Sequence, residues 1–147
     1  MTDNTTDQTR AGFIAVLGAP NAGKSTFINR VVGTKVSIVS PKVQTTRTRV
    51  LGIMMQGQSQ LIFIDTPGIF EPKRRLDRAM VAAAWGGASD ADHIILIVDC
   101  LRGYDKDTRR IVEGLKDKKR QVDLVLNKVD LVQKEILLEL TSVLSAE

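Results

Sequence analysis

Short, densely apolar segments alternate along the chain with longer segments whose apolar residues recur every three or four positions. The densely apolar segments predict β-strands, because buried strands carry apolar side chains without a helical period. We expect strands at residues 12–18, 50–55, 60–65, 93–99 and 121–127. Residues 93–99 read HIILIVD, which is typical of a strand covered on both faces. Residues 56–59 predict a hairpin turn between the second and third of these strands.

The amphipathic segments predict helices. They cover residues 24–32, 75 to about 85, 105 to about 118, and 133–144. Gly33 ends the first helix and the Gly86-Gly87 pair stops the second, because glycine is a poor helix former. Asp105 or Asp107 lies near the start of the third. Residues 34–49 show no clean period and predict a long loop.

The alternation of strands and helices predicts an α/β fold. The expected sheet is mostly parallel, has helices on both faces and includes one antiparallel hairpin strand. A ligand of such a sheet binds at the carboxyl ends of the strands. Residues 1–11 are expected to be a disordered lead, and residues 12–147 one domain.

Composition narrows the class of protein. With 147 residues and 43% apolar content, the chain can form one hydrophobic core. Its net charge of +4 permits an acidic partner such as RNA without requiring one. A single cysteine, Cys100, fits a reducing cytosol, and no apolar run approaches the roughly 18 residues of a spanning helix. The acidic start lacks the apolar stretch of a secretory signal. These features together predict a cytoplasmic protein.

A glycine-rich motif follows the first strand and opens the first helix. It has the pattern G-x-x-x-x-G-K-[ST], which in this context predicts a phosphate-binding loop of the P-loop NTPase type. Its glycines let backbone N–H groups point at phosphate oxygens. Lys24 is expected to bridge the β- and γ-phosphates, and Ser25 to bind Mg²⁺. The predicted nucleotide-binding residues here are Gly18, Ala19, Pro20, Asn21, Ala22, Gly23, Lys24, Ser25 and Thr26.

A second motif, D-x-x-G, ends the third strand. Asp65 is expected to hold the magnesium, usually through water. The backbone N–H of Gly68 is expected to meet the γ-phosphate, so that loss of this phosphate releases the following loop. The predicted nucleotide-binding residues are Asp65, Thr66, Pro67, Gly68 and Ile69. Thr45 and Thr46 are expected to complete the magnesium site. Thr46 aligns better with it, but one sequence leaves the choice between the two open.

A third motif, Asn127-Lys128-Val129-Asp130, follows the fifth strand and predicts guanine specificity. Guanine presents an N1–H and an N2 amine side by side, and the carboxylate of Asp130 can accept hydrogen bonds from both. Adenine offers no such pair, and a carboxylate left unpaired would be penalised. Asn127 holds the base and the loop, and the stem of Lys128 packs over the ring.

With these motifs, the chain resembles the translation-factor-like GTPases, and among them the Era family. The resemblance runs from about residue 12 to residue 147 and rests on the segments GAPNAGKSTFIN, SPKVQTTRTRVLGI and DTPGIFEPKRRL. It implies a GTPase, a monomer by our expectation, that binds GTP and GDP and assists assembly of the small ribosomal subunit with its 16S rRNA. It further implies peripheral contact with the inner face of the cytoplasmic membrane. Relatives of the Der and MnmE types share the phosphate loop and a Thr-Thr-Arg segment.

The resemblance also bears on catalysis. Ras-like enzymes place a glutamine after the D-x-x-G motif to orient the attacking water, whereas this chain has Ile69. Slow intrinsic turnover is therefore expected. Asn21 matches a position that supports K⁺ in potassium-stimulated relatives, so we expect K⁺ near Asn21. The candidate catalytic residues are Lys24, Asn21, Thr46 and Gly68. Arg47 and Arg49 are weaker candidates for stabilising transition-state charge.

Two features of the chain's end qualify this interpretation. The Ser145-Ala146 pair resembles a base-closing motif, but its helical surroundings predict the end of a helix. We therefore expect the GTP-binding domain to lack a last strand, the KH-type RNA-binding domain to be absent, and the fifth strand to form an open sheet edge. Two alternatives remain open: a P-loop ATPase, and a GTP-dependent binding switch of the Der or MnmE type with little catalysis.

Overall fold

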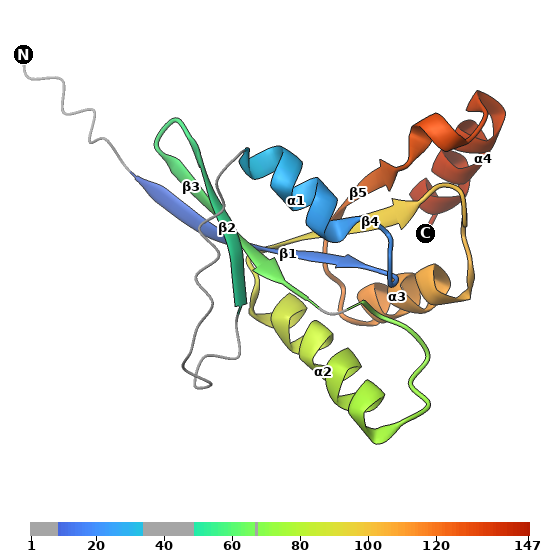
Figure 1. The fold of residues 1–147 in the computed structure, drawn as a ribbon, viewed down its shortest axis with the longest axis horizontal. Helices are drawn as coiled ribbons and strands as arrows, with labels where there is room; N and C mark the ends of the chain where they lie inside the picture. The colour runs from blue at the N-terminus through green and yellow to red at the C-terminus, as the bar shows by residue number, and fades with distance from the viewer. Residues whose placement is uncertain (1–8, 34–48, 67) are drawn as a thin grey trace, which may run out of the picture.

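The computed structural model describes residues 9–33, 49–66 and 68–147. Within them, five strands form one sheet in the order β2-β3-β1-β4-β5 (Figure 1). The strands β1, β3, β4 and β5 run parallel, and β2 runs antiparallel to β3. In chain order the elements are β1 (Arg10–Gly18), α1 (Lys24–Val32), β2 (Arg49–Gln56), β3 (Ser59–Asp65), α2 (Arg75–Asp90), β4 (His93–Asp99), α3 (Lys106–Asp117), β5 (Val122–Asn127), the 3₁₀ turn η1 (Val129–Leu131) and α4 (Lys134–Ser145). The expected α/β class, mostly parallel sheet and hairpin strand are confirmed.

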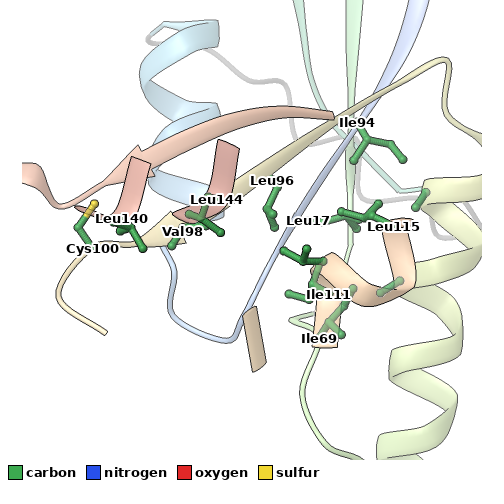
Figure 2. Close-up of a cluster of buried hydrophobic side chains, with 13 residues drawn as sticks. Leu17, Ile69, Ile94, Leu96, Val98, Cys100, Ile111, Leu115, Leu140 and Leu144 are labelled. Atoms are coloured by element: carbon green, nitrogen blue, oxygen red, sulfur yellow. The ribbon is translucent and has the colours of Figure 1, made fainter. Parts of the chain in front are cut away.

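The core lies on both faces of the sheet, because successive side chains of a strand point in opposite directions. On β4, Ile94, Leu96 and Val98 belong to a cluster shared with α2, α3 and α4. Ile97 belongs instead to a cluster shared with α1. Figure 2 shows the larger cluster, into which Ile69 also points. Helices therefore cover both faces, as β4's continuous apolar sequence predicts.

The end of α2 differs from the prediction. Gly86 and Gly87 were expected to stop this helix, yet it continues to Asp90. Each glycine costs about 1 kcal/mol relative to alanine in a helix interior. Tertiary packing offsets this cost, because Ala88, the next residue of the helix, is buried in the core. Gly87 also permits a close approach, since a Cβ there would lie 3.3 Å from Cγ2 of Thr66.

Most other boundaries fall within a residue or two of those expected. Strand β1 begins at Arg10, so residues 10 and 11 belong to the strand and not to a disordered lead. Asp105 caps α3, its carboxylate accepting the N–H of Thr108 at 2.9 Å. The loop expected over residues 34–49 lies outside the described residues except for Arg49, which begins β2. Ser145 is the last residue of α4, as expected for a helix end.

Strand β5 lies at one edge of the sheet and leads into the last elements of the fold. Within the described residues, β5 pairs with β4 alone and forms the edge of the sheet, as expected. Its last residue, Asn127, leads directly into η1 and α4. Among the described helices, none is both long and apolar enough to cross a lipid bilayer.

Candidate nucleotide-binding site

The sequence motifs meet at the carboxyl ends of the parallel strands. The parallel strands β1, β3, β4 and β5 end at Gly18, Asp65, Asp99 and Asn127, respectively. Because the strands are parallel, these four ends lie on the same side of the sheet (Figure 1). This is the side on which open α/β sheets bind ligands. The fold therefore brings together segments that are separated by up to about a hundred residues.

The phosphate loop, residues 18–25, curls back on itself between β1 and α1. Asn21 and Gly23 have positive φ angles of 63° and 100°, and the N–H of Ala22 donates to the carbonyl of Ala19 at 3.2 Å. The Lys24 ammonium folds over the loop and donates to the carbonyls of Gly18 and Ala19 at 3.4 and 3.3 Å. The positive charge of Lys24 thus lies within the curve of the loop, where a phosphate group would need it.

The N-terminus of α1 is suited to an anion. The residue before it is Gly23, which has no side chain to cap the helix. The first turn of α1, all of whose residues are described, contains no acidic side chain. Its N–H groups and the positive end of the helix dipole are therefore available to an anion such as phosphate. Ser25 and Thr26 lie in this turn and are exposed.

Asn127 fastens the end of β5 to the phosphate loop. Its side-chain amide donates to the carbonyl of Ala22 at 2.9 Å. The two segments approach so closely that a Cβ at Gly23 would lie 2.1 Å from Nδ2 of Asn127. A side chain at this position would displace the amide of Asn127, so glycine suits the position both for its positive φ and for this contact.

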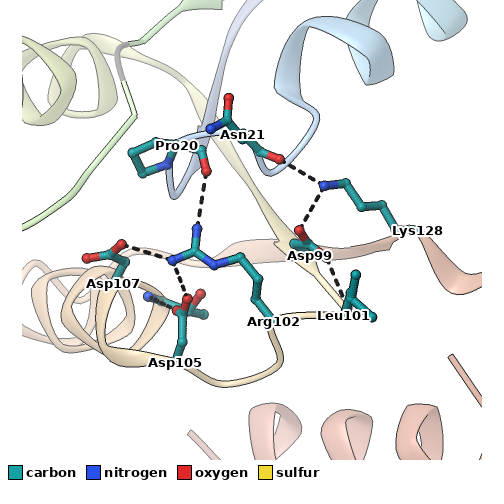
Figure 3. Close-up of polar contacts among 9 residues, drawn as sticks. Pro20, Asn21, Asp99, Leu101, Arg102, Asp105, Asp107 and Lys128 are labelled. Atoms are coloured by element: carbon teal, nitrogen blue, oxygen red, sulfur yellow. Dashed lines mark hydrogen bonds and ion pairs between the residues drawn. The ribbon is translucent and has the colours of Figure 1, made fainter. Parts of the chain in front are cut away.

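Lys128 makes a second connection, shown in Figure 3. It adopts a left-handed conformation with φ of 62°, and its ammonium donates to the carbonyl of Asn21 at 3.1 Å. It also pairs with Oδ2 of Asp99 at 2.8 Å. Asp99 is buried, and its other oxygen accepts the N–H of Leu101 at 2.9 Å. Burial raises the pKa of Asp99, but the hydrogen bonds from Lys128 and Leu101 outweigh burial and hold the pKa below its ordinary value.

The predicted guanine-reading residue, Asp130, is exposed within η1, one residue beyond exposed Val129. The N–H of Leu131 donates to the carbonyl of Lys128 at 3.0 Å and closes this turn. Lys128 therefore has its side chain against the phosphate loop, while the carboxylate of Asp130 is open to solvent and to a base.

The D-x-x-G segment contacts the opposite side of the phosphate loop. The buried hydroxyl of Thr66 donates to the carbonyl of Val16 at 2.5 Å, so its observed contact is with β1. A Cβ at Gly68 would lie 2.9 Å from both N and Cα of Pro20, which shows how closely the two loops pack. The N–H of Ile69 donates to the carbonyl of Gly18 at 3.0 Å. The side chain of Ile69 is fully buried and contributes to the core.

The magnesium ligands are described in part. Ser25 is exposed in the first turn of α1, and Asp65 ends the neighbouring strand β3. A hydroxyl and a carboxylate are oxygen donors of the kind that Mg²⁺ prefers, so the chemistry of the set fits this ion. Thr45, Thr46 and Pro67 lie outside the described residues. Among the described residues, no cluster of three or more His, Cys, Asp or Glu side chains could hold a metal without help from a ligand.

Two residues of this edge were missed as site residues by sequence reasoning. Asp99 holds Lys128, and Arg102 donates to the carbonyl of Pro20 at 3.3 Å. The available signal was position: Asp99 ends a strand at the edge where the motifs gather, and Arg102 follows it by three residues. Neither residue lies in one of the motifs that predict nucleotide binding.

The family model of 50S ribosome-binding GTPases matches residues 13–128. GTPase Era of Dinoroseobacter shibae is 56% identical over 149 residues, covering 99% of this chain and 48% of that protein. GTPase Era of Sinorhizobium medicae is 61% identical over 134 residues, covering 91% of this chain and 43% of that protein. The chain thus spans less than half the length of these relatives.

A solved structure is similar as well. A crystal structure of Era in complex with MgGDPNP and nucleotides 1506–1542 of 16S ribosomal RNA superposes with a TM-score of 0.77 at 39% identity. The alignment covers 93% of this chain and 47% of that one. Family model, relatives and fold agree with the motifs gathered at the sheet edge. The chain belongs to the 50S ribosome-binding GTPase family, and within it to the Era type.

Proposed function

We propose that residues 12–147 form a domain that binds GTP and hydrolyses it to GDP and phosphate. The observation that carries the proposal is the junction between the phosphate loop and the segment that begins at Asn127. Asn127 and Lys128 donate to the consecutive carbonyls of Ala22 and Asn21, at 2.9 and 3.1 Å. This junction supports the proposal, because Asp130, the predicted guanine-reading residue, follows Lys128 by only two residues. A P-loop ATPase would not need this guanine-reading motif, because it binds adenine.

Each end of the nucleotide then has its own residues. The N–H groups of the phosphate loop and Lys24 hold the phosphates, and Asp130 accepts hydrogen bonds from the guanine edge. Ser25, Asp65 and Thr46 would hold a Mg²⁺ ion, which would supply positive charge to neutralise the phosphates. Gly68 offers its N–H to the γ-phosphate. The remaining members of the binding set are Gly18, Ala19, Pro20, Ala22, Gly23, Thr26, Thr66, Pro67, Ile69 and Val129.

The rate of hydrolysis is expected to be slow. The residue after the D-x-x-G motif orients water in Ras-like enzymes, and here it is Ile69, whose apolar side chain is fully buried. Positioning of water must therefore come from other groups. We propose that K⁺ near Asn21 contributes charge there, supported by the resemblance to potassium-stimulated relatives and by the exposed position of Asn21. Single-turnover hydrolysis should be faster in KCl than in NaCl, and equal rates would remove K⁺ from the proposal.

A GTP-dependent binding switch with negligible catalysis is the alternative function, which the Era relatives do not favour. Single-turnover measurement with K⁺ present separates the two. Conversion of bound GTP to GDP within minutes to hours supports the GTPase. GTP that stays intact while the protein remains folded supports the switch.

The first test is displacement of a fluorescent GDP analogue by GTP and by ATP with Mg²⁺ present. GTP should compete at concentrations at least 100-fold lower than ATP, because an unpaired carboxylate penalises the wrong base. Equal competition by both nucleotides would support the ATPase instead.

Asp130→Asn makes this test specific. Xanthosine triphosphate has a carbonyl where guanine has its N2 amine, so the asparagine amide can donate where the carboxylate could only accept. The variant should lose about 100-fold in affinity for GTP and gain affinity for xanthosine triphosphate. Glu139→Gln on α4 removes one exposed carboxylate away from the motifs and should change neither affinity.

We extend the proposal to the ribosome on the strength of the relatives. The similar Era crystal structure holds a segment of 16S ribosomal RNA, which is small-subunit RNA, whereas the family description names the 50S subunit and supports ribosome binding in general. We propose a cytoplasmic role in small-subunit assembly, with this chain as a monomer and with peripheral membrane contact as a further implication of the resemblance. Co-sedimentation with small ribosomal subunits in GTP but not in GDP would support the ribosomal role. Equal sedimentation in both would argue against a nucleotide-controlled one.

A further inference from the structure

The loop between β4 and α3 supplies an arginine to the phosphate loop. Nη1 of Arg102 donates to the carbonyl of Pro20 at 3.3 Å, although the two residues lie 82 positions apart. Nη2 of Arg102 lies 2.8 Å from Asp105 and donates to Asp107 at 3.3 Å. Figure 3 shows the guanidinium between these two carboxylates and the backbone of Pro20. The planar fork of an arginine suits such a three-way arrangement.

Pro20 is also the residue against which Gly68 packs. The contact is between backbones, since a Cβ at Gly68 would lie 2.9 Å from N and Cα of Pro20. Pro20 therefore contacts both Arg102, through its carbonyl, and Gly68 of the D-x-x-G segment. A shift of Pro20 would move the surface against which Gly68 rests.

The energetics favour a positioning function over a stabilising one. The side chain of Arg102 is 43% exposed, and exposed ion pairs contribute little to stability. The two carboxylates nevertheless restrict the orientation of the guanidinium, which fixes where its remaining donor can reach. Asp105 is itself fixed, because its other oxygen caps α3.

We propose that Arg102 is a positioning residue for the γ-phosphate side of the site, acting through the carbonyl of Pro20. The inference rests on the proposed binding of GTP. Arg102 fixes the part of the phosphate loop that Gly68 contacts. It thereby supports the position from which the N–H of Gly68 meets the γ-phosphate. The base side of the loop is held separately, through the carbonyls of Asn21 and Ala22.

This division predicts a selective defect. Arg102→Gln should weaken binding of a non-hydrolysable GTP analogue about 3- to 10-fold more than binding of GDP, which is the size expected for loss of one solvent-exposed hydrogen bond. It should slow single-turnover hydrolysis and leave the preference for GTP over ATP unchanged. Arg102→Lys keeps one donor for Pro20 and should restore part of the loss.

The matched control is Arg120→Gln. Arg120 also donates to a backbone carbonyl, that of Ala91 at 2.6 Å, but in a part of the fold away from the motifs. Loss of this bond should lower the melting temperature without changing the ratio of GTP-analogue to GDP affinity. The comparison separates positioning from general stability. If Arg102→Gln does not fold by circular dichroism, Asp107→Asn, which removes one carboxylate holding Arg102, should show the same defect at smaller size.

The outcomes separate the two proposals. If the unaltered chain binds no guanine nucleotide, the proposed function fails and this inference with it. If the unaltered chain binds GTP, and Arg102→Gln keeps the original affinity ratio or weakens both nucleotides equally, this inference alone is overturned. A selective loss that Arg102→Lys partly restores supports it.

Discussion

The two sides of the phosphate loop are held by different kinds of contact. The base side consists of the carbonyls of Asn21 and Ala22, which accept hydrogen bonds from Lys128 and Asn127. Both donors are side chains from the end of β5. Asp99 at the end of β4 in turn holds Lys128.

The γ side consists of Gly18 and Pro20, and their contacts with the D-x-x-G segment are between backbones, beside the side-chain hydrogen bond that Arg102 donates to Pro20. The N–H of Ile69 donates to the carbonyl of Gly18, and Gly68 packs against Pro20 without room for a methyl group. A contact made by side-chain hydrogen bonds weakens by degrees when one partner changes. A contact made by close backbone packing fails when a single carbon is added. The comparison teaches that the hydrogen bonds of the base side can be weakened by degrees, whereas the contact between Gly68 and Pro20 depends on the absence of a side chain at Gly68.

The largest expected effect comes from Gly23→Ala, which disrupts the point where the loop meets Asn127. The new Cβ would lie 2.1 Å from Nδ2 of Asn127, and the positive φ of 100° adds about 1–2 kcal/mol of backbone strain. Affinity for GTP and GDP should both fall at least about 100-fold, measured with the fluorescent GDP analogue.

Gly57→Ala is its control. Gly57 also has a positive φ, of 60°, but nothing lies within 4 Å of a Cβ at that position. It should lose stability by a similar backbone cost and bind nucleotide normally. Equal loss of affinity in both variants would mean that strain, and not the contact with Asn127, is responsible.

Gly68→Ala tests the γ side alone. The substitution forces Pro20 and the D-x-x-G segment apart, while the base-side hydrogen bonds are unaffected. Affinity for a GTP analogue should fall about 10-fold more than affinity for GDP, measured by competition. Gly86→Ala, where nothing lies within 4 Å of the added Cβ, should leave both affinities unchanged and stabilise α2 by about 0.5–1 kcal/mol. A Gly68→Ala variant that binds both nucleotides normally would contradict the packing argument.

The smallest expected effect comes from Asp99→Asn, which loosens the base side. Nucleotide affinity should fall a few-fold, and the free energy of unfolding at pH 7 should fall by about 1–2 kcal/mol. Because the pKa of Asp99 is lowered in the folded protein, its stabilising contribution is fully present at pH values above the ordinary pKa of an aspartate. It is lost as the pH falls through the lowered pKa.

Urea unfolding of the unaltered chain and of Asp99→Asn, measured from pH 7 down to pH 3, tests this pH dependence. The difference in stability should be constant above about pH 5 and should shrink below about pH 4. Asp123→Asn breaks the exposed pair with His93 and should cost under 1 kcal/mol at pH 7. A difference that grows toward low pH would contradict the role of Asp99.

Much of this fold and site follows from local sequence. Runs such as residues 93–99 and the spacing of G-x-x-x-x-G-K-S predict a strand and a turn because their side chains or glycines determine them directly. The end of α2 could not be predicted, because burial of Ala88 decides it against the propensity of two glycines. Arg102 could not be predicted either. Its partner Pro20 lies in a loop 82 positions earlier, and solvated arginines in a loop look alike until the chain is folded.

The central position of β1 has a consequence for how the protein reaches its native state. Arg10 pairs with Ser59, and Ile14 pairs with His93. During synthesis β1 leaves the ribosome with neither neighbour made, and its second edge stays open until β4 follows. Pairings so distant in sequence slow folding, and an apolar strand with unpaired edges is prone to aggregate. The nascent chain should therefore depend on chaperones or on low synthesis temperature, a requirement set by strand order rather than by stability.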